Sequence, residues 1–535
     1  MISIMIKNNF KILGILFFVI SIFFNQVMIG DELFLSSDTL SAKTISHGIQ
    51  LAEDKYGEYP LWMPWIFAGL PSTHSMQNVS EYYFPHQIIS LIKMTTIPWF
   101  WNFLLHFIFC GFGMYLLLRK LKVSDGVALF GAISFMIAPY MVVMIVHGHG
   151  SQVMTASYIP WIMWALLRLQ ENPSLQKIGV LSLLIGLQLQ RAHIQIAYYT
   201  WMLMIAYLIF TFIVDRQFRG NINFYLGSII SSLLGFCMSL WIYIPLLNYA
   251  GLSNRSISNG GSSMDYATSW SLHPFESLTM LLPSSFGFGD STYFGYMPFT
   301  NFPNYAGLIL IILSICAFYN NSKNKIIFFF LFILISSLLI SFGKFFPLYG
   351  LLYDWLPYFN KFRVPSMILI LSQFSICLIA SIGFDNLLAH IKSKDRKVLN
   401  ILGGSSLLIL LIAVWRYFSH DFSTHRIQHQ IINLERTSMI WNDVMMVLSI
   451  FILCALTLYL LFNKKIDNSK FILFITIISL FDIGRVNQRI TNPPEDIAHP
   501  VIKNEKYFNA QINSDEIIEF FKLDKSKFRV LPLGE

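Results

Sequence analysis

Two carboxylates in the first polar stretch of the chain have the chemistry of a catalytic acid or base. Asp38 lies shortly beyond the first apolar run, and Glu81 follows further along the same stretch. A carboxylate near a membrane interface can accept the proton of a hydroxyl, and a pair can bracket a hydroxyl or hold a divalent metal. A solvated loop aspartate or helix N-cap remains an alternative for Asp38, as does an ordinary loop glutamate for Glu81. We therefore treat Asp38 and Glu81 as candidate catalytic residues.

Basic and polar side chains at two short turns are candidates for binding an anion. His149 lies at one turn, and Arg191, His193 and Gln195 lie at the other, which interrupts the apolar stretch 178–214. An arginine there is costly unless it is paired, hydrated or close to phosphate. The two turns predict a cationic wall for a lipid-linked phosphate, although a purely interfacial role for the histidines remains open.

Two further candidates for substrate binding lie later in the chain. Arg363 directly precedes an apolar run, where it serves either as a snorkelling anchor or as a clamp on a phosphate headgroup. Glu276 belongs to a long polar loop at about 248–304, whose glycines and prolines predict a folded re-entrant or lid segment. These residues can act together only if the chain brings their loops to one side.

The composition identifies the elements that must position them. Hydrophobic residues make up 55% of the 535 residues and charged residues only 12%, against roughly 25% charged in soluble domains. This balance excludes a soluble enzyme, a disordered chain and a nucleic-acid binder. The five cysteines lie inside apolar runs without metal-ligand spacing, which predicts neither a disulfide nor a structural zinc. The expected class is an all-α polytopic membrane protein.

Apolar runs long enough to cross a bilayer number about 13, each span needing about 20 residues. The first is interpreted as an uncleaved span rather than a signal peptide, because it is long and lacks a cleavage site. The runs lie near 10–28, 97–118, 127–146, 153–168, 178–190, 196–214, 223–247, 305–319, 326–342, 367–388, 398–415, 440–462 and 471–484.

The distribution of charge predicts which loops face the cytoplasm. Alternation from a cytoplasmic N-terminus places every short basic loop inside, as the positive-inside rule requires. These basic loops lie near 119–122, 168–177, 216–219, 323–325, 392–397 and 464–470. The long polar loops then face outside; they lie at 29–96, 147–152, 190–195, 248–304, 343–366 and 416–439. We expect a site at the extracytoplasmic membrane–water boundary. No Walker loop or dinucleotide fingerprint is present, so no nucleotide cofactor is expected and an activated donor must be carried by lipid.

An ordered set of short motifs runs through much of the chain. It comprises Asp38-Thr39, Pro60-Leu-Trp-Met-Pro64, Phe67-Ala-Gly-Leu-Pro71, Tyr83-Phe-Pro85, His149 with Pro160-Trp161, His193-Ile-Gln195, Thr268-Ser-Trp-Ser271, Pro274-Phe-Glu276, Gly295-Tyr-Met-Pro-Phe-Thr300, Tyr305-Ala-Gly307 and Phe362-Arg-Val-Pro-Ser366. With this set the chain resembles the bacterial YfhO-type membrane proteins of the GT-C glycosyltransferase superfamily. Ala192 departs from the pattern, since glycine is expected before the histidine.

The resemblance implies a GT-C-like helical bundle over residues 1–484 in the inner (cytoplasmic) membrane. Residues 485–535 would then begin an extracytoplasmic C-terminal domain that is incomplete in this chain. It also implies transfer of a sugar from a polyprenyl-phosphate donor to a cell-envelope glycan or polymer, with Asp38 at the position of the family's acidic base or metal ligand. Whether a divalent metal takes part stays open. The alternatives are a lipid-linked glycan transporter or flippase, and a non-catalytic envelope-biogenesis protein.

Overall fold

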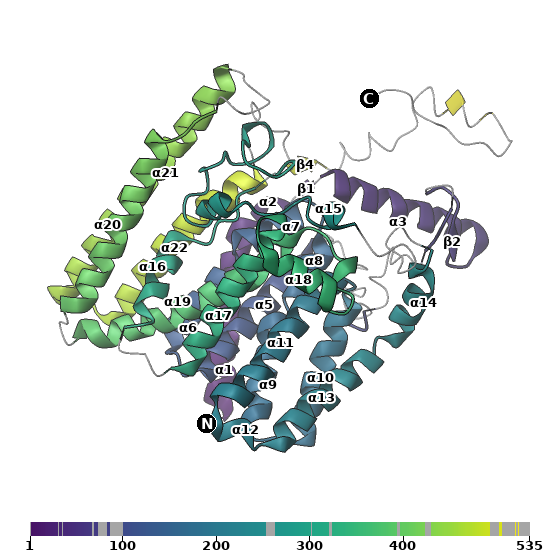
Figure 1. Cartoon of the computed structure of the whole chain (residues 1–535), viewed down its shortest axis with the longest axis horizontal. Helices are drawn as coiled ribbons and strands as arrows, with labels where there is room; N and C mark the ends of the chain where they lie inside the picture. The colour runs from purple at the N-terminus through teal and green to yellow at the C-terminus, as the bar shows by residue number, and fades with distance from the viewer. Residues whose placement is uncertain are drawn as a thin grey trace.

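The computed structural model shows an all-α protein built around a bundle of long apolar helices (Figure 1). It describes residues 2–29, 32–34, 36–66, 69–72, 83–85, 100–252, 263–300, 302–319, 324–392, 396–422, 430–492, 502–504, 519–520 and 523. Within these ranges the only sheets are two short antiparallel pairs. Strand β1 (Glu32–Phe34) pairs with β4 (Ile502–Asn504), and β2 (Trp62–Met63) pairs with β3 (Leu70–Pro71).

Six stretches in the described residues are long and apolar enough to cross a membrane. They are α5 (Trp101–Lys120), α6 with α7 (Asp125–Met136, Pro139–Val146), α11 (Ile194–Val214), η7 with α19 (Pro365–Ile368, Leu369–Lys392), α20 (Arg396–Phe418) and α21 (Gln430–Phe462). A seventh is obtained if α13 (Ile222–Cys237) and α14 (Leu240–Ala250), which meet at a 68° bend, form one span. The protein thus has several helices of transmembrane length, as expected for a multi-pass membrane protein.

The expected number of about 13 spans is larger than this count, because several of the predicted runs fold into shorter helices. The run near 153–168 is divided between α8 (Gly150–Ala156) and α9 (Ile159–Glu171), where Pro160 enters the first turn of α9. The run near 305–319 contains the nine-residue helix α16 (Leu308–Cys316). Two more apolar helices are short, namely α10 (Leu175–Gln190) and α17 (Lys325–Ser341), while α1 (Ile2–Phe23) enters the comparison only with its segment Asn9–Phe23. Helix α22 (Asn468–Thr491) extends beyond residue 484, where the transmembrane part was expected to end.

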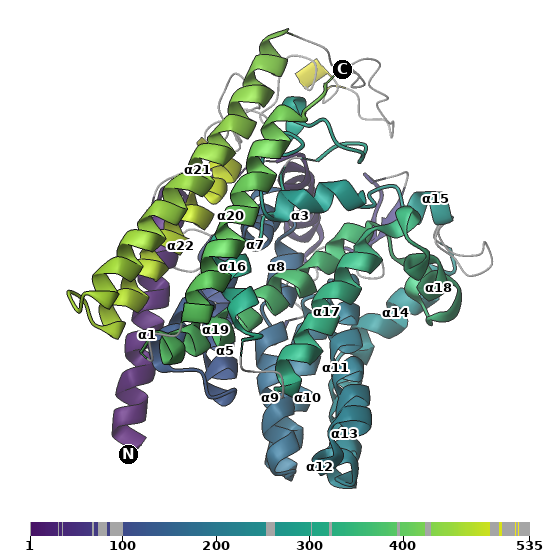
Figure 2. The same ribbon diagram turned by 60° about the vertical axis from the view of Figure 1, so that its left-hand side comes forward.

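The loops predicted to be cytoplasmic meet at one end of the bundle. Lys325 forms an ion pair with Asp215 at 2.8 Å, and Lys120 pairs with Glu171. The hydroxyl of Ser124 donates to Asp385 at 2.5 Å. Figure 2 shows the N-terminus and α12 (Arg216–Arg219) at this end, with α3 (Ser37–Tyr56) and α15 (Met264–Ala267) toward the other.

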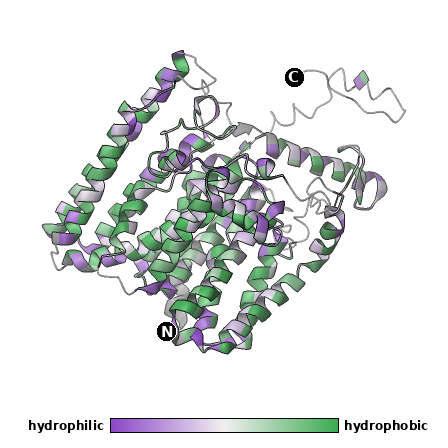
Figure 3. Cartoon of the chain, in the orientation of Figure 1, coloured by the Kyte–Doolittle hydropathy of each residue, from purple (hydrophilic) through white to green (hydrophobic). Residues whose placement is uncertain are grey.

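The centre of the bundle and its edge differ strongly in burial. In the spans 125–146 and 365–391, 94% of the residues of the apolar window are buried, but only 17% in α20 and 22% in α21. Figure 1 shows α20 and α21 as a hairpin along one side, and Figure 3 shows hydrophobic residues along the helices. A helix that is apolar yet unburied is the type that faces lipid.

The polar end carries structure that the sequence interpretation treated as loops. Helix α3 lies inside the predicted loop 29–96, after the short helix α2 (Asn25–Ile29), and its start is capped by the Ser36 side chain, which accepts from the Thr39 amide at 3.2 Å. Helix α21 likewise begins inside the predicted loop 416–439. The 263–305 segment contains α15 and the 3-10 turns η3 (Pro274–Met280) and η4 (Asp290–Thr292); the segment before α19 contains η5 (Gly343–Phe345), α18 (Pro347–Trp355) and η6 (Phe359–Lys361).

Candidate functional site

Asp38 and His149 meet at the polar end of the bundle. Asp38 lies in the first turn of α3, where the positive end of the helix dipole stabilises its negative charge. His149 directly precedes α8. The Nε2 atom of His149 lies 3.4 Å from Oδ2 of Asp38, with 41% and 59% of the two side chains exposed. The pair is therefore close enough to interact and open enough to meet a substrate.

Backbone geometry at Gly148 brings the two residues together. Its φ of +83° lies in the left-handed region that favours glycine. A Cβ at this position would lie 2.6 Å from the amide nitrogen of Thr39, a distance at which atoms overlap. The start of α3 thus packs against the backbone of the 147–150 turn, and this contact holds Asp38 beside His149.

Two further histidines, His147 and His193, lie near Asp38 and His149. Burial lowers the pKa of His147 to about 4, with a smaller lowering by His149 and an opposing effect of Asp38. Burial likewise lowers the pKa of His193 to about 4, and His149 contributes. His193 Nδ1 accepts the Ile196 amide at 3.3 Å and so caps α11. Both imidazoles are neutral near pH 7, so they enclose the site without adding positive charge.

Arg363 supplies the charge that the histidines lack. Gln195 Nε2 donates to the Arg363 carbonyl at 2.7 Å, and Arg363 Nη1 donates to the Tyr266 hydroxyl at 2.8 Å. The guanidinium also contributes to the lowered pKa of His149, after burial and against the opposing effect of Asp38. The structure therefore gathers five of the predicted site residues at one end: Asp38, His149, His193, Gln195 and Arg363.

Arg191 belongs to a different cluster, although only two residues separate it from His193. Its guanidinium lies over the Tyr83 ring, 4.1 Å from the ring centroid, and Nη2 contacts the Met154 sulfur at 2.6 Å. The side chain is buried, and within the described residues its Nε and Nη1 atoms have no hydrogen-bond partner. Burial lowers the pKa of Arg191, while Tyr83 and Tyr158 oppose this effect. The single cationic wall expected from the sequence is thus divided into two parts.

The polar residues around Arg191 were not predicted as part of any site. The Tyr83 hydroxyl hydrogen-bonds with that of Tyr158. His106 is fully buried and lies one helical turn after Asn102. Its Nδ1 atom lies 2.8 Å from the Asn102 carbonyl. The signal available in the sequence was a pair of polar residues spaced by four within an apolar run, which marks one helix face.

Glu276 is held by its own loop. Its carboxylate accepts the amides of His273 and Tyr296, both at 3.2 Å, and the Tyr293 hydroxyl. The first of these bonds closes a capping box at the start of η3. Burial raises the pKa of Glu276, and the hydrogen bonds oppose the shift. Its observed contacts are those of a structural carboxylate, and its predicted role in substrate binding stays a prediction.

The sequence left a divalent metal open and named Glu81 as a second carboxylate, and the described residues test neither role. Glu81 lies outside them. Within them, no group of three or more His, Cys, Asp or Glu side chains is arranged to hold a metal ion. Asp38 and His149 form only a pair, so we assign no metal ligands.

Charged side chains of α20 and α21 bind the backbone of the 284–293 loop, and they too were missed. Arg416 Nε donates to the Ser285 carbonyl at 2.9 Å, and Arg436 Nε donates to the Thr292 carbonyl at 2.9 Å. Asp443 accepts the Ser284 amide at 2.6 Å. This loop is therefore fixed at its base, while its flanks reach the site through Tyr266 and through Phe302, whose ring stacks on His147 at 6.2 Å.

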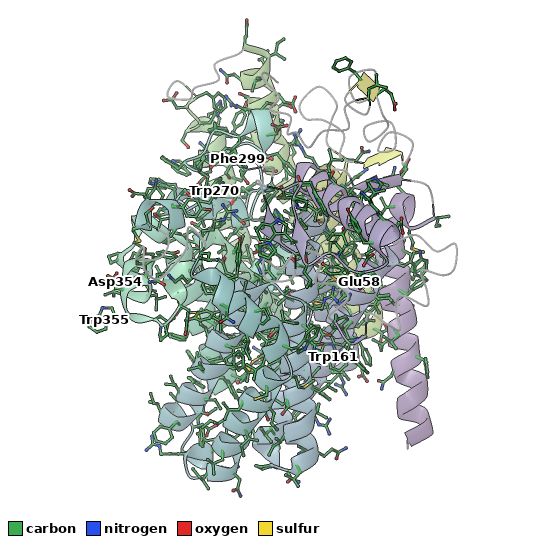
Figure 4. All side chains as sticks on the ribbon, turned by 90° about the vertical axis from the view of Figure 1, so that its right-hand side faces the viewer. Glu58, Trp161, Trp270, Phe299, Asp354 and Trp355 are labelled. Carbon is green, nitrogen blue, oxygen red and sulfur yellow. The ribbon has the colours of Figure 1, made fainter. Side chains whose placement is uncertain are left out.

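Aromatic rings gather on the outer surface of the same segment. Trp270 and Phe299 lie with ring centroids 5.4 Å apart (Figure 4), and Tyr296 stacks on His273 at 3.7 Å. Trp161, lower in Figure 4, instead lies in the bundle and donates to the Phe109 carbonyl at 2.7 Å.

No protein-family profile matches the chain, and no curated protein matches it at a significant level. The resemblance to GT-C transferases stays an expectation from the ordered motifs, whose members Asp38, His149, His193, Gln195 and Arg363 lie at one end of the bundle.

Proposed function

We propose that the protein is a membrane glycosyltransferase of GT-C type, which moves a sugar from a polyprenyl-phosphate donor to an extracytoplasmic acceptor in the cell envelope. One observation carries the proposal. Asp38, His149, His193 and Arg363 come from four distant segments and gather at the end of the bundle opposite the basic loops. A carboxylate, neutral imidazoles and a guanidinium at a membrane boundary suit the activation of a hydroxyl beside a phosphate.

The transfer requires two kinds of group, and both are present. The acceptor hydroxyl needs a base, for which the 59% exposed Asp38 side chain is available, directly or through His149. The departing lipid phosphate carries negative charge, which a nearby cation stabilises. Arg363 has that charge, and its Nη1 is held by the Tyr266 hydroxyl. The finer architecture of a GT-C bundle belongs to the same proposal.

The lipid partner is supported by the edge of the bundle. Helices α20 and α21 leave most of their apolar surface unburied, as expected for helices that face the bilayer. A donor with a polyprenyl tail could keep its tail in the bilayer while its phosphate reaches the boundary where Arg363 lies. Cations that approach a phosphate in this setting form short, charge-assisted hydrogen bonds.

The test compares envelope glycans by mass spectrometry in cells with the gene, without it, and with Asp38→Asn. We expect a glycan modification to disappear on deletion, to return with the wild-type gene and to stay absent with Asp38→Asn at equal membrane abundance. Asp54→Asn, an exposed carboxylate on the same helix, is the control and should restore the modification. Identical glycans in all strains would refute the proposal. Movement of a labelled lipid-linked sugar across proteoliposomes without any acceptor would instead identify a flippase.

A further inference from the structure

We infer that His149 is the group that takes the proton from the acceptor hydroxyl, and that Asp38 positions and stabilises it. This inference rests on the proposed sugar transfer and names the base within that site. It differs from the expectation drawn from the sequence, in which Asp38 is itself the base. The contact between Asp38 and His149 and the exposure of the His149 side chain carry it.

The two ring nitrogens of His149 have different roles. Nε2 faces Oδ2 of Asp38 at 3.4 Å. An ionised carboxylate can only accept hydrogen bonds, so a neutral His149 presents its N–H at Nε2 and keeps its lone pair at Nδ1. The side chain is 41% exposed, so a hydroxyl can reach the ring. A histidine with one nitrogen next to a carboxylate and the other nitrogen basic has the arrangement of a general base.

The charges around His149 suit this role. Among the described residues, the groups within electrostatic reach of its ring are Asp38 on α3, His147 on its own turn, His193 at the start of α11 and Arg363 before η7. Burial and the charge of Arg363 favour the neutral ring, and Asp38 favours the protonated one. His149 is thus neutral before the reaction, and the Asp38 carboxylate stabilises the imidazolium that forms.

The step balances without any other reactant. The acceptor oxygen forms a bond to the anomeric carbon, and its proton passes to Nδ1 of His149. The bond between the anomeric carbon and the phosphate oxygen breaks, and its electron pair leaves with the lipid phosphate. His149 then carries one positive charge against Asp38, and it later releases the proton to solvent.

The experiment uses the full-length protein in nanodiscs, with a synthetic polyprenyl-phosphate sugar and an oligosaccharide acceptor. Transfer is followed from pH 4.5 to 8.5 for the wild type, His149→Gln and Asp38→Asn. His47→Gln, an exposed histidine on α3, and Asp54→Asn are controls that should behave as wild type. General-base catalysis contributes about 10²–10⁴-fold, so His149→Gln should lower kcat by that factor while KM for the donor stays unchanged.

Asp38→Asn separates the two candidate bases. If His149 is the base, the rate falls at low pH as His149 becomes protonated. Loss of the Asp38 carboxylate lowers the pKa of His149, so in Asp38→Asn this fall in rate, the acid limb of the pH profile, moves to lower pH. The kcat of Asp38→Asn is also reduced. If Asp38 is the base, the limb disappears in Asp38→Asn, while His149→Gln keeps both the limb and most of kcat; that result overturns the inference and leaves the transferase intact. If the wild type transfers nothing and deletion leaves the envelope glycans unchanged, the proposed function fails, and the base assignment fails with it.

Folding is checked independently by the thermal midpoint and the gel-filtration profile. Should His149→Gln not fold, His149→Ala with added imidazole decides the matter. Recovery of transfer with imidazole supports the inference. A fully folded His149→Ala protein whose activity equals that of the wild type without imidazole contradicts it.

Discussion

Nη1 of Arg485 on α22 lies 3.5 Å from Oδ1 of Asp443 on α21, beneath the outer loop whose Ser284 amide Asp443 also binds at 2.6 Å. Asp443 is buried, and it joins two helices to the loop that flanks the candidate site. This ion pair therefore couples the helical edge of the protein to the structure around Arg363 and His147.

Removal of Asp443 should destabilise the protein strongly. Asp443→Ala removes one of the two carboxylates, Asp443 and Asp482, that interact with Arg485, and it leaves the Ser284 amide without its acceptor. A buried donor without a partner costs about 1–3 kcal/mol. Glu435→Gln is the matched control, because Glu435 on the same helix pairs with Arg489 at 3.8 Å and is 39% exposed. An exposed pair contributes about 0–1 kcal/mol. Thermal unfolding in detergent should show a large drop only for Asp443→Ala; equal midpoints would contradict this account.

A methyl group at Gly148 should separate Asp38 from His149. Gly148→Ala places a Cβ 2.6 Å from the Thr39 nitrogen at a φ of +83°, and the left-handed conformation alone costs an L-residue about 1–2 kcal/mol. We expect lower stability and loss of sugar transfer. The control is Gly179→Ala on α10, where a Cβ would meet no atom within 4 Å; there alanine should be neutral or slightly stabilising. Full activity in Gly148→Ala would show that the packing of α3 on the turn does not matter.

Stability should fall on acidification because of two histidines. Burial lowers the pKa values of His147 and His193 to about 4, whereas an unfolded histidine has a pKa of about 6.5. The unfolded chain therefore binds more protons between about pH 6.5 and 4, and stability is lost as the pH falls through this window. Thermal midpoints measured at pH 7.5 and 4.5 should differ less in the double variant His147→Asn, His193→Asn than in the wild type. Asparagine can still cap α11. An unchanged difference would assign the acid sensitivity to other groups.

The sequence was sufficient to predict which polar segments share a side of the bundle, because charge bias and alternation of spans depend only on residue order. It did not predict α3, since that helix is polar and lacks the apolar stripe used to find spans. Local signals were nevertheless present, with Ser36 before the first turn and Gly57 at a φ of 73° just after the last.

The binding of the 284–293 loop by Arg416 and Arg436 was missed for a different reason. Helix α21 has 33 residues, or about 50 Å at 1.5 Å per residue, against a hydrocarbon core of about 30 Å. Its first turns therefore extend beyond the bilayer as regular helix, where polar residues had been interpreted as loop. Which carbonyls Arg436 would meet depends on the fold of the 284–293 loop, and no local pattern specifies that contact.

The direction of the Arg191 side chain likewise depends on tertiary packing. The guanidinium lies over Tyr83, with two nitrogens lacking partners in the described residues, and a buried charge without a partner destabilises a fold. Arg191→Met keeps an unbranched, flexible side chain and removes the charge, so the thermal midpoint should stay equal or rise. If the arginine is instead retained to hold the donor phosphate, the same variant should raise KM for the polyprenyl-phosphate sugar at least tenfold. Gln190→Leu, which changes the neighbouring hydrogen bonds of Phe84 and Met238 without altering charge, is the control and should not raise KM in this way. A marked fall in the midpoint of Arg191→Met, with KM unchanged, would show that Arg191 stabilises the fold and has no part in donor binding.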